Sequence, residues 1–278
     1  MKKFLLLLVL IGLLTALQFP FSRYMAKKSL KARVGFVADS AIMRFASADH
    51  KETIAALLTI KSFLYYGQLV EEKRQGSKNV DFSGLSRLLH TASRLDPYNF
   101  DIYYFPQAII AWEPGFAESV VDLLDYGMKY RTTDYMLPFY AGFDSANFLR
   151  DFEAAAGYYK KAGDLTGDPF FAKLTAQYLF EANQTGMAIA YLQAMLKGAT
   201  NPVVRKTYEQ RLAALEAVAT IERTVQRYKE REGKLPVTIE QLVQSGDLAA
   251  VPVDPFGGIF SLDADGRPVS TSYLLKRK

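Results

Sequence analysis

The sequence predicts a mainly α-helical protein, in which antiparallel helical hairpins stack into an α-solenoid that ends in a long capping helix and a small C-terminal α+β module. Two observations favour this fold. Small residues recur in the middle of predicted helices at equal intervals, since Gly142 follows Ala108 by 34 residues and Ala176 follows Gly142 by 34. Such a fixed period is typical of repeat architectures. Apolar residues also step by three and four along most of the chain, as one face of a helix requires.

The predicted organisation has three parts. Residues 1–23 form a signal anchor or transmembrane helix, residues 24–202 form the helical repeats, and residues 203–278 form the long helix with the C-terminal module. The chain has 278 residues and 50% hydrophobic content, which is enough to bury a core.

The amino-terminal segment predicts contact with a membrane. Lys2 and Lys3 precede an apolar run over residues 4–21, whose length lies between that of a secretory signal and that of a spanning helix. No small-x-small cleavage site follows, so we expect an uncleaved single-pass anchor in the inner membrane, with secretion after cleavage as the alternative. Five basic residues between 23 and 33 would keep the body in the cytoplasm, whereas the short basic start is typical of export signals. We expect an extracytoplasmic, periplasmic body.

Charge and cysteine content exclude several classes of function. Seven of the 34 basic residues lie in the first 33 positions, which leaves 34 − 7 = 27 basic against 29 acidic residues in the rest of the chain. A nearly neutral body lacks the basic face that nucleic-acid binding requires. The absence of cysteine excludes disulfides, c-type haem, iron–sulfur clusters and cysteine-based zinc sites. We expect no cofactor.

The repeats begin after an N-terminal helical region. Residues 24–73 are predicted to be helical, residues 75–81 to form a loop, and Ser83–Leu95 to form a helix that Asp96-Pro97 ends. Three helical pairs follow, with the small residues named above in their first helices. Gly127, Ala162 and Met195 are the corresponding positions of the second helices.

This pattern resembles the tetratricopeptide repeat, and the resemblance covers residues 51–202. It is most complete in the units that contain Gly142 and Ala176. The unit over 100–131 is degenerate, and Pro106 predicts a kink because proline interrupts a helix interior. The resemblance implies a concave surface, lined by the first helix of each pair, that binds an extended peptide or a partner helix. The residues expected on that surface are Phe105, Ile109, Trp112, Phe139, Phe143, Asn147, Lys173, Gln177 and Phe180.

The C-terminal part changes character. Asn201-Pro202 is a cap followed by a first-turn proline, which predicts a long helix to about Glu232. A short helix over 238–245 and a hairpin around Asp265-Gly266, with strands at 259–262 and 268–271, are expected next. Residues 205–275 resemble the globular domain of type II secretion pseudopilins. The family's Gly-Phe-x-x-x-Glu processing site is absent, which counts against a pilin-like subunit.

Catalytic motifs are scarce. The two histidines, His50 and His90, cannot form a histidine-pair metal site with the sequence around them, and no nucleophile elbow, phosphate loop or dinucleotide fingerprint occurs. We therefore expect no catalytic residues and no small-molecule substrate. Asp254, Asp263 and Asp265 are weak candidates for a cation site, because the full calcium-loop series is missing.

The leading functional hypothesis is a non-enzymatic, membrane-anchored scaffold that binds a protein partner in the cell envelope, for example in a secretion or pilus assembly system. Two alternatives stay open. One is an envelope enzyme or cation-binding protein with its site in the C-terminal module. The other is a pilin-like structural subunit.

Overall fold

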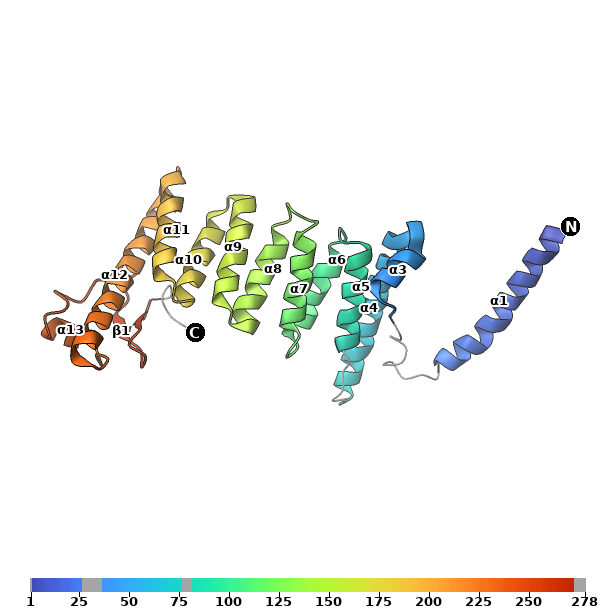
Figure 1. Ribbon diagram of the computed structural model, residues 1–278, viewed down its shortest axis with the longest axis horizontal. Coiled ribbons are helices and arrows are strands. Elements are labelled where there is room, and N and C mark those ends of the chain that lie inside the picture. The colour runs from blue at the N-terminus through green and yellow to red at the C-terminus, as the bar shows by residue number, and fades with distance from the viewer. Residues whose placement is uncertain (1, 27–36, 77–81, 273–278) are drawn as a thin grey trace. The chain divides into compact units, whose positions relative to one another are not determined.

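The computed structural model describes residues 2–26, 37–76 and 82–272, and these residues are mainly helical (Figure 1). The predicted mainly α fold class is confirmed. The chain divides into two compact units, Met1–Arg131 and Thr132–Lys278. This division falls inside the predicted repeat region and not at residues 23 or 202.

The described part of the first unit contains α-helices and 3-10 turns. Its 3-10 turns are η1 (Ala48–His50) and η2 (Ile110–Trp112). Its α-helices are α1 (Lys2–Ala26), α3 (Ser40–Ser47), α4 (Lys51–Arg74), α5 (Phe82–Leu95), α6 (Asp101–Ile109) and α7 (Ala117–Met128).

The second unit contains a series of helices and a small C-terminal set of elements. The π-helical turn η3 (Ser145–Leu149) extends the first of these helices. The helices are α8 (Met136–Asp144), α9 (Phe152–Thr166), α10 (Pro169–Glu181), α11 (Thr185–Gly198), α12 (Pro202–Glu232) and the short α13 (Ile239–Gln244). The strands are β1 (Phe260–Leu262) and β2 (Pro268–Ser270).

The prediction of one helical region over residues 24–73 is wrong in detail. The Asp39 side chain accepts a hydrogen bond from the Ala41 amide and starts α3, and Ala48 then takes a φ of 44° that ends it. A positive φ is incompatible with a continuing right-handed helix. Residues 27–36 and 77–81, which carry part of the predicted helix and most of the predicted loop, lie outside the described residues.

One helical stretch among the described residues, Ser40–Glu71, is long and apolar enough to cross a membrane. It is not the predicted anchor at residues 4–21. A core helix of a soluble protein meets the same criterion, so the finding does not by itself assign a membrane span.

The first unit is organised around α5, which contacts α3, α4, α6 and α7. Leu85, Leu88 and Leu89 on α5 have no exposed surface, as the predicted helical period over this segment requires. The Tyr103 hydroxyl donates to the Pro97 carbonyl over 2.8 Å, which ties the start of α6 to the Asp96-Pro97 turn. Helix α6 runs through Pro106, and its bonding changes to a 3-10 turn at Ile110.

The second unit contains consecutive helices that contact their neighbours in chain order from α8 to α12. Asp151, Asp168 and Asn201 each cap the helix that follows, and the αL glycines Gly167 and Gly233 end α9 and α12. The predicted cap at Asn201 and the end of the long helix at Glu232 are confirmed.

The C-terminal elements share one core with the helices. Ile221 on α12, Leu242 on α13 and Phe260 on β1 belong to the same buried cluster as Ala176 and Leu192. Residues on both sides of residue 202 therefore contribute to one buried cluster. The predicted hairpin is present, with Phe260 paired to Ser270 in antiparallel register.

Helices α6, α8 and α10 bury the same sequence positions. The buried positions of α8 and α10 differ by 34 residues, which is the predicted period. Those of α6 and α8 differ by 35 residues, one more than that period. The shared buried positions are 102, 103, 106, 107, 110 and 111 in the first helix, 137, 138, 141, 142, 145 and 146 in the second, and 171, 172, 175, 176, 179 and 180 in the third. Asp144 is an additional buried residue of the second helix.

This register shifts the predicted repeat pattern by one position in the first helical pair, which contains α6. Gly142 and Ala176 are equivalent, but their counterpart in α6 is the buried Gln107, whereas Ala108 is exposed. The spacing of small residues indicates Ala108 because a glutamine is unusual at the buried position. With Gln107 as the reference, the interval to Gly127 equals the interval from Gly142 to Ala162.

The small residue at position 142 is needed for a close approach between α8 and α9. A Cβ atom on Gly142 would lie 3.1 Å from Cε1 and Cζ of the buried Tyr159 ring. By contrast, a Cβ atom on Gly157 of α9 would meet nothing within 4 Å. Gly142 therefore sits at a tight helix contact, whereas Gly157 sits in open space.

We expect Gly142→Leu to lower the free energy of unfolding of the second unit by about 1–3 kcal/mol, because it overfills a packed contact. Gly157→Leu is the matched control and should be neutral or stabilising by up to about 1 kcal/mol, since it replaces an exposed helical glycine. Urea titrations of both full-length variants measure the difference. Equal effects of the two substitutions would contradict the packing role of Gly142.

Candidate protein-binding surface

The shared burial register also identifies the positions that face away from the core. In each first helix, three residues spaced by four lie outside the buried set, and none of them is buried. Residues spaced by four lie on one face of a helix. We call these positions the outer stripe: Tyr104, Ala108 and Trp112 on α6 and η2, Phe139, Phe143 and Asn147 on α8 and η3, and Lys173, Gln177 and Glu181 on α10.

The outer stripe contains six of the nine residues predicted for a concave binding surface. These six are Trp112, Phe139, Phe143, Asn147, Lys173 and Gln177. Phe105 and Ile109 lie one position beyond Tyr104 and Ala108, as the corrected register requires. Phe180 is only 1% exposed and belongs to the core of the second unit, so its ring is not available to a partner.

Phe105 contributes to packing within the first unit. Its ring centroid lies 4.4 Å from that of Phe63 and 5.8 Å from that of Tyr66, both edge to face. Phe63 and Tyr66 belong to α4, so Phe105 joins α6 to the preceding helix. Such edge-to-face pairs add about 0.5–1.5 kcal/mol beyond burial of area.

The aromatic residues of the outer stripe are held by neighbouring rings. Tyr104 stacks on Phe100 with centroids 5.7 Å apart, and Phe139 contacts the rings of Tyr159 and Phe171 at 6.2 Å and 6.0 Å. Trp112 is 61% exposed, the largest exposure among these rings. Aromatic side chains already fixed in place lose little conformational freedom on binding.

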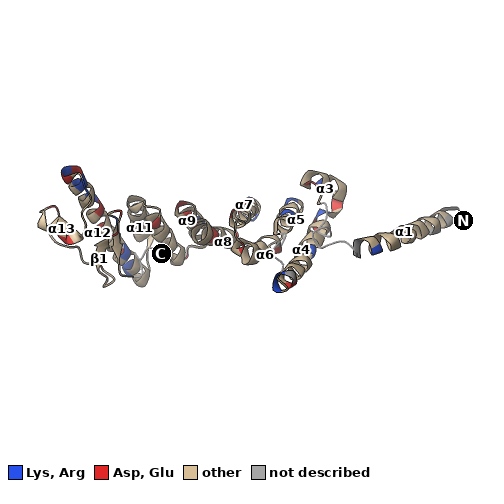
Figure 2. Ribbon diagram, turned by 90° about the horizontal axis from the view of Figure 1, so that it is seen from below, with Lys and Arg blue, Asp and Glu red and all other residues tan. Residues whose placement is uncertain are grey.

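The helices that carry the first two parts of the outer stripe, α6 and α8, contain few charged residues. The α6 segment contains one acidic residue, Asp101, and the α8 segment contains one, the buried Asp144, with no basic residue in either. Lys, Arg, Asp and Glu gather instead on α12 and at the C-terminal end of α4 (Figure 2). The stripe on α6 and α8 therefore offers aromatic and apolar contacts.

The three aspartates considered for a cation site do not converge. Asp254 is buried, and its carboxylate accepts hydrogen bonds from the Phe256 amide at 2.8 Å and from the Ser270 hydroxyl. Asp263 accepts from the amides of Asp265 and Arg267 at 2.9 Å and 2.8 Å, which fixes the hairpin turn. Among the described residues, no group of three or more His, Cys, Asp or Glu side chains lies close enough to hold a metal ion.

His90 forms a polar contact between α5 and α7. Its Nε2 lies 3.1 Å from the carbonyl oxygen and 3.0 Å from the Oγ of Ser119, and Ser86 Oγ lies 2.8 Å from the same Oγ. When Nε2 carries the proton, it can donate to the Ser119 carbonyl oxygen, which can only accept. These contacts join α5 to α7.

Arg211 is a buried charge that the sequence pattern did not indicate. Its guanidinium on α12 lies 6.0 Å from the centroid of the Phe256 ring, and burial lowers its pKa to about 10. This cation–π contact joins α12 to the loop that Asp254 organises.

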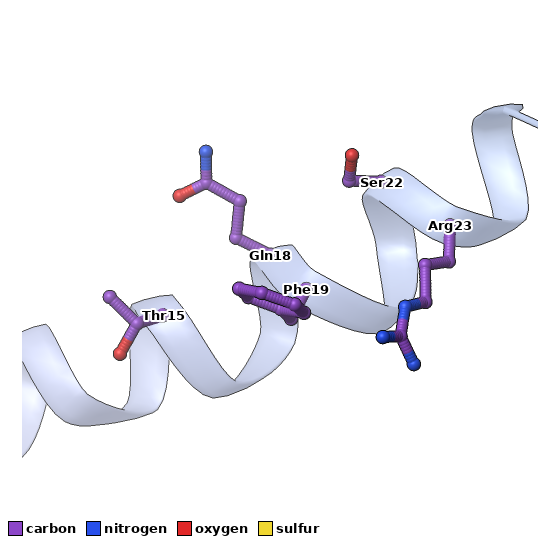
Figure 3. A pocket seen from close by; sticks show the side chains of 5 residues that line it. All are labelled: Thr15, Gln18, Phe19, Ser22 and Arg23. Carbon is purple, nitrogen blue, oxygen red and sulfur yellow. The ribbon is translucent and has the colours of Figure 1, made fainter.

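A hollow on the surface of α1 does not have the features of a binding site. Figure 3 shows its five residues, Thr15, Gln18, Phe19, Ser22 and Arg23, all on this one helix. The Thr15 hydroxyl donates to the Ile11 and Gly12 carbonyls of its own helix, and the Arg23 guanidinium lies 5.6 Å from the Phe19 ring centroid. An open groove on a single helix does not enclose a ligand.

Asp254→Ala should lower the free energy of unfolding by about 1–3 kcal/mol, because the Ser270 hydroxyl and the Phe256 amide would lose their acceptor. Asp265→Ala is the control, since Asp265 is exposed and lies in the same C-terminal region. Millimolar calcium should leave the melting temperature of the wild-type chain unchanged. A calcium-dependent rise that Asp254→Ala abolishes would instead reveal a cation site.

Acid should weaken the α5–α7 contact through His90. Burial lowers the pKa of this imidazole below its ordinary value of 6.5. Above that value His90 is neutral in both the folded and unfolded chains. As the pH falls below it, the unfolded chain binds the proton more readily, so stability decreases. The protection of α5 and α7 against hydrogen exchange, corrected for intrinsic rates, should therefore fall between about pH 7.5 and pH 5.5 through this group.

His90→Gln should reduce this pH dependence, because an amide donates to Ser119 without titrating. His50→Gln is the control, since His50 is exposed at the start of α4. An unchanged pH profile in His90→Gln would show that other groups cause the effect.

No family model matches this sequence, and no curated protein is similar to it.

Proposed function

We propose that the chain is a non-enzymatic, membrane-anchored scaffold, whose helical hairpins resemble a tetratricopeptide solenoid and bind a protein partner through the outer stripe. The observation that carries the proposal is the recurrence of one burial register in α6, α8 and α10, which leaves equivalent outward positions on three hairpins. Outward faces at equivalent positions of successive hairpins are where repeat proteins bind their partners, and each of the two units carries such positions.

The chemistry of the outer stripe favours a polypeptide ligand. Its exposed positions include Tyr104 and Trp112, and tyrosine and tryptophan dominate the binding energy of protein interfaces. Lys173 and Gln177 on α10 add polar groups that can pair with a peptide backbone or acidic side chains. An extended peptide or an amphipathic helix is the ligand class that this mixture fits.

The anchor in this proposal is α1. It is a helix of 25 residues, and its described apolar side chains are exposed, among them Phe4, Leu10 and Leu17. A helix of this length and apolarity matches the hydrocarbon thickness of a bilayer. We place the body on the periplasmic side of the inner membrane, where the partner would be part of an envelope assembly such as a secretion or pilus system.

Neither alternative function has an observation in its favour. An enzyme or cation-binding site in the C-terminal region would need free carboxylates, and those of Asp254 and Asp263 accept hydrogen bonds within the loop and turn that they organise. A pilin-like subunit would need the processing motif that is absent from the sequence.

Site-specific photo-crosslinking in native membranes tests the partner-binding surface. A photoreactive phenylalanine analogue at position 104, 108 or 112 should give one discrete adduct with the same protein. The same analogue at position 98 is the control, because Tyr98 is as exposed as Trp112 but lies outside the outer stripe. Adducts that are absent, or equally strong from position 98, would exclude the stripe as a binding surface.

Trp112→Ala should weaken binding of the crosslinked partner by at least about 30-fold, which corresponds to the roughly 2 kcal/mol of an interface hot spot. Titration of the purified full-length chain with that partner measures the change. Tyr98→Ala should leave the affinity unchanged, and neither variant should shift the melting temperature, because both side chains are exposed.

A further inference from the structure

Helix α4 has an unusual distribution of side chains. Its core-facing positions include the small or polar residues Ala55, Thr59 and Ser62, which are at most 3% exposed. Its opposite face carries Leu57, Ile60 and Leu64, which are 55%, 51% and 68% exposed. Since 57, 60 and 64 follow a helical spacing of three and four, these large apolar side chains share one face.

The buried hydroxyl groups of α4 are satisfied within the helix. Thr59 Oγ1 donates to the Ala55 carbonyl at 2.9 Å, and Ser62 Oγ donates to the Leu58 carbonyl at 2.8 Å. The side of α4 packed against α5 therefore carries no unsatisfied hydroxyl at these two positions. The exposed aliphatic side has no comparable compensation in water, where burial of apolar area is the main favourable term.

Helix α3 shows the same arrangement, with large apolar side chains exposed and a small polar side chain buried. Phe45 is 90% exposed and Ile42 is 61% exposed, whereas Ser47 of the same helix is buried. Helix α3 contacts both α4 and α5 (Figure 1). Soluble monomers rarely expose several large aliphatic and aromatic side chains on adjacent elements. We call the exposed apolar side chains of these two adjacent helices, Ile42, Phe45, Leu57, Ile60 and Leu64, the α3–α4 apolar face; Leu57, Ile60 and Leu64 share one side of α4, and Ile42 and Phe45 are exposed on α3.

We propose that the α3–α4 apolar face lies against the surface of the lipid bilayer, with its side chains inserted at the boundary between headgroups and acyl chains. This inference rests on the proposed anchoring of the chain by α1. Two features of the chain favour lipid over other occupants, namely the length of the connection to α1 and its charge.

The connection is short. Helix α1 ends at Ala26 and α3 begins at Ser40, so only residues 27–39 join them. A fully extended chain of that length spans at most about 45 Å. If α1 crosses the membrane, the start of α3 therefore lies within about 45 Å of the lipid surface, which lets α3 and α4 reach it.

The connection is also basic. Lys27, Lys28, Lys31 and Arg33 occur in it without an acidic residue before Asp39. A basic segment next to a membrane span is attracted to anionic lipid headgroups on the side where it emerges.

The orientation along the surface follows from the opposite face of α4. Because Ala55, Thr59, Tyr65 and Leu69 are buried within the first unit, lipid can cover only one side of this helix. A helix with one lipid-facing side lies in the interface, and its apolar side chains reach roughly 5–10 Å into the boundary region.

Spin labels on the full-length chain test the inference. The chain has no cysteine, so single substitutions can be labelled without background. Leu64→Cys, Leu57→Cys and Phe45→Cys report on the α3–α4 apolar face, Leu10→Cys reports on α1, and the exposed Val253→Cys is the aqueous control. The labelled chains are reconstituted in vesicles of phosphatidylcholine and phosphatidylglycerol.

The three labels on α3 and α4 should collide with oxygen more often than with a water-soluble nickel chelate, at a depth of roughly 5–10 Å below the phosphates. The label at position 253 should show the reverse. Introducing Leu64→Glu should return the label at position 57 to water, while the circular dichroism of the chain stays unchanged, because position 64 is exposed.

The outcomes separate this inference from the proposed function. If the label at position 10 is immersed while those at 45, 57 and 64 contact water, the apolar face does not lie on lipid and the anchor stands. If the label at position 10 is also in water, the anchor itself is refuted. If labels at position 64 are shielded from both reagents and show short distances between chains, a second copy covers the face, and the lipid assignment is overturned.

Discussion

The structure depends on one constraint, the burial of the same positions in the first helix of successive hairpins, which is tightest where α8 approaches α9. Gly142 sits against the Tyr159 ring at a distance that a larger side chain could not keep, and the equivalent positions Ala176 and Gln107 are likewise buried. Each first helix therefore commits its buried positions to neighbouring helices. Whatever remains on its outward side is set by the same register, which is why the outer stripe recurs at the same intervals as the buried positions.

Elements with strong local chemistry were predictable from the sequence. The Asn201 cap with its first-turn proline placed the start of α12, and Asp265-Gly266 placed the hairpin, because both signals act through the backbone within a few residues. The sequence does not indicate the break between α3 and α4, because Ala48 adopts a positive φ and no glycine or proline marks the position. Tertiary contacts decide such a conformation, and local sequence does not encode them.

The outer stripe was predictable in the second unit but was offset in the first. Gly142 and Ala176 gave the right phase for α8 and α10, so Phe139, Phe143 and Lys173 were placed at outward positions. In α6 the buried equivalent is a glutamine, and a rule based on side-chain size selected the exposed Ala108 instead. A single-residue error rotates a helix by about 100°, which exchanged Tyr104 for Phe105 and Ala108 for Ile109.

The polar groups that most resemble a catalytic site are used in holding the fold together. Asp254 organises the loop before β1, Asp263 fixes the hairpin turn, and His90 joins α5 to α7. The exposed groups differ in kind between two regions of the chain. Helices α3 and α4 present mainly aliphatic side chains together with Phe45, and such apolar groups suit a fluid hydrocarbon because they need no matching partner geometry. The outer stripe presents Tyr104 and Trp112, whose rings combine large area with a polar edge and so discriminate between partners. Under the proposed function, one surface would fix the scaffold at the membrane and the other would select what it binds there, so that tethering raises the effective concentration of the partner without a new contact.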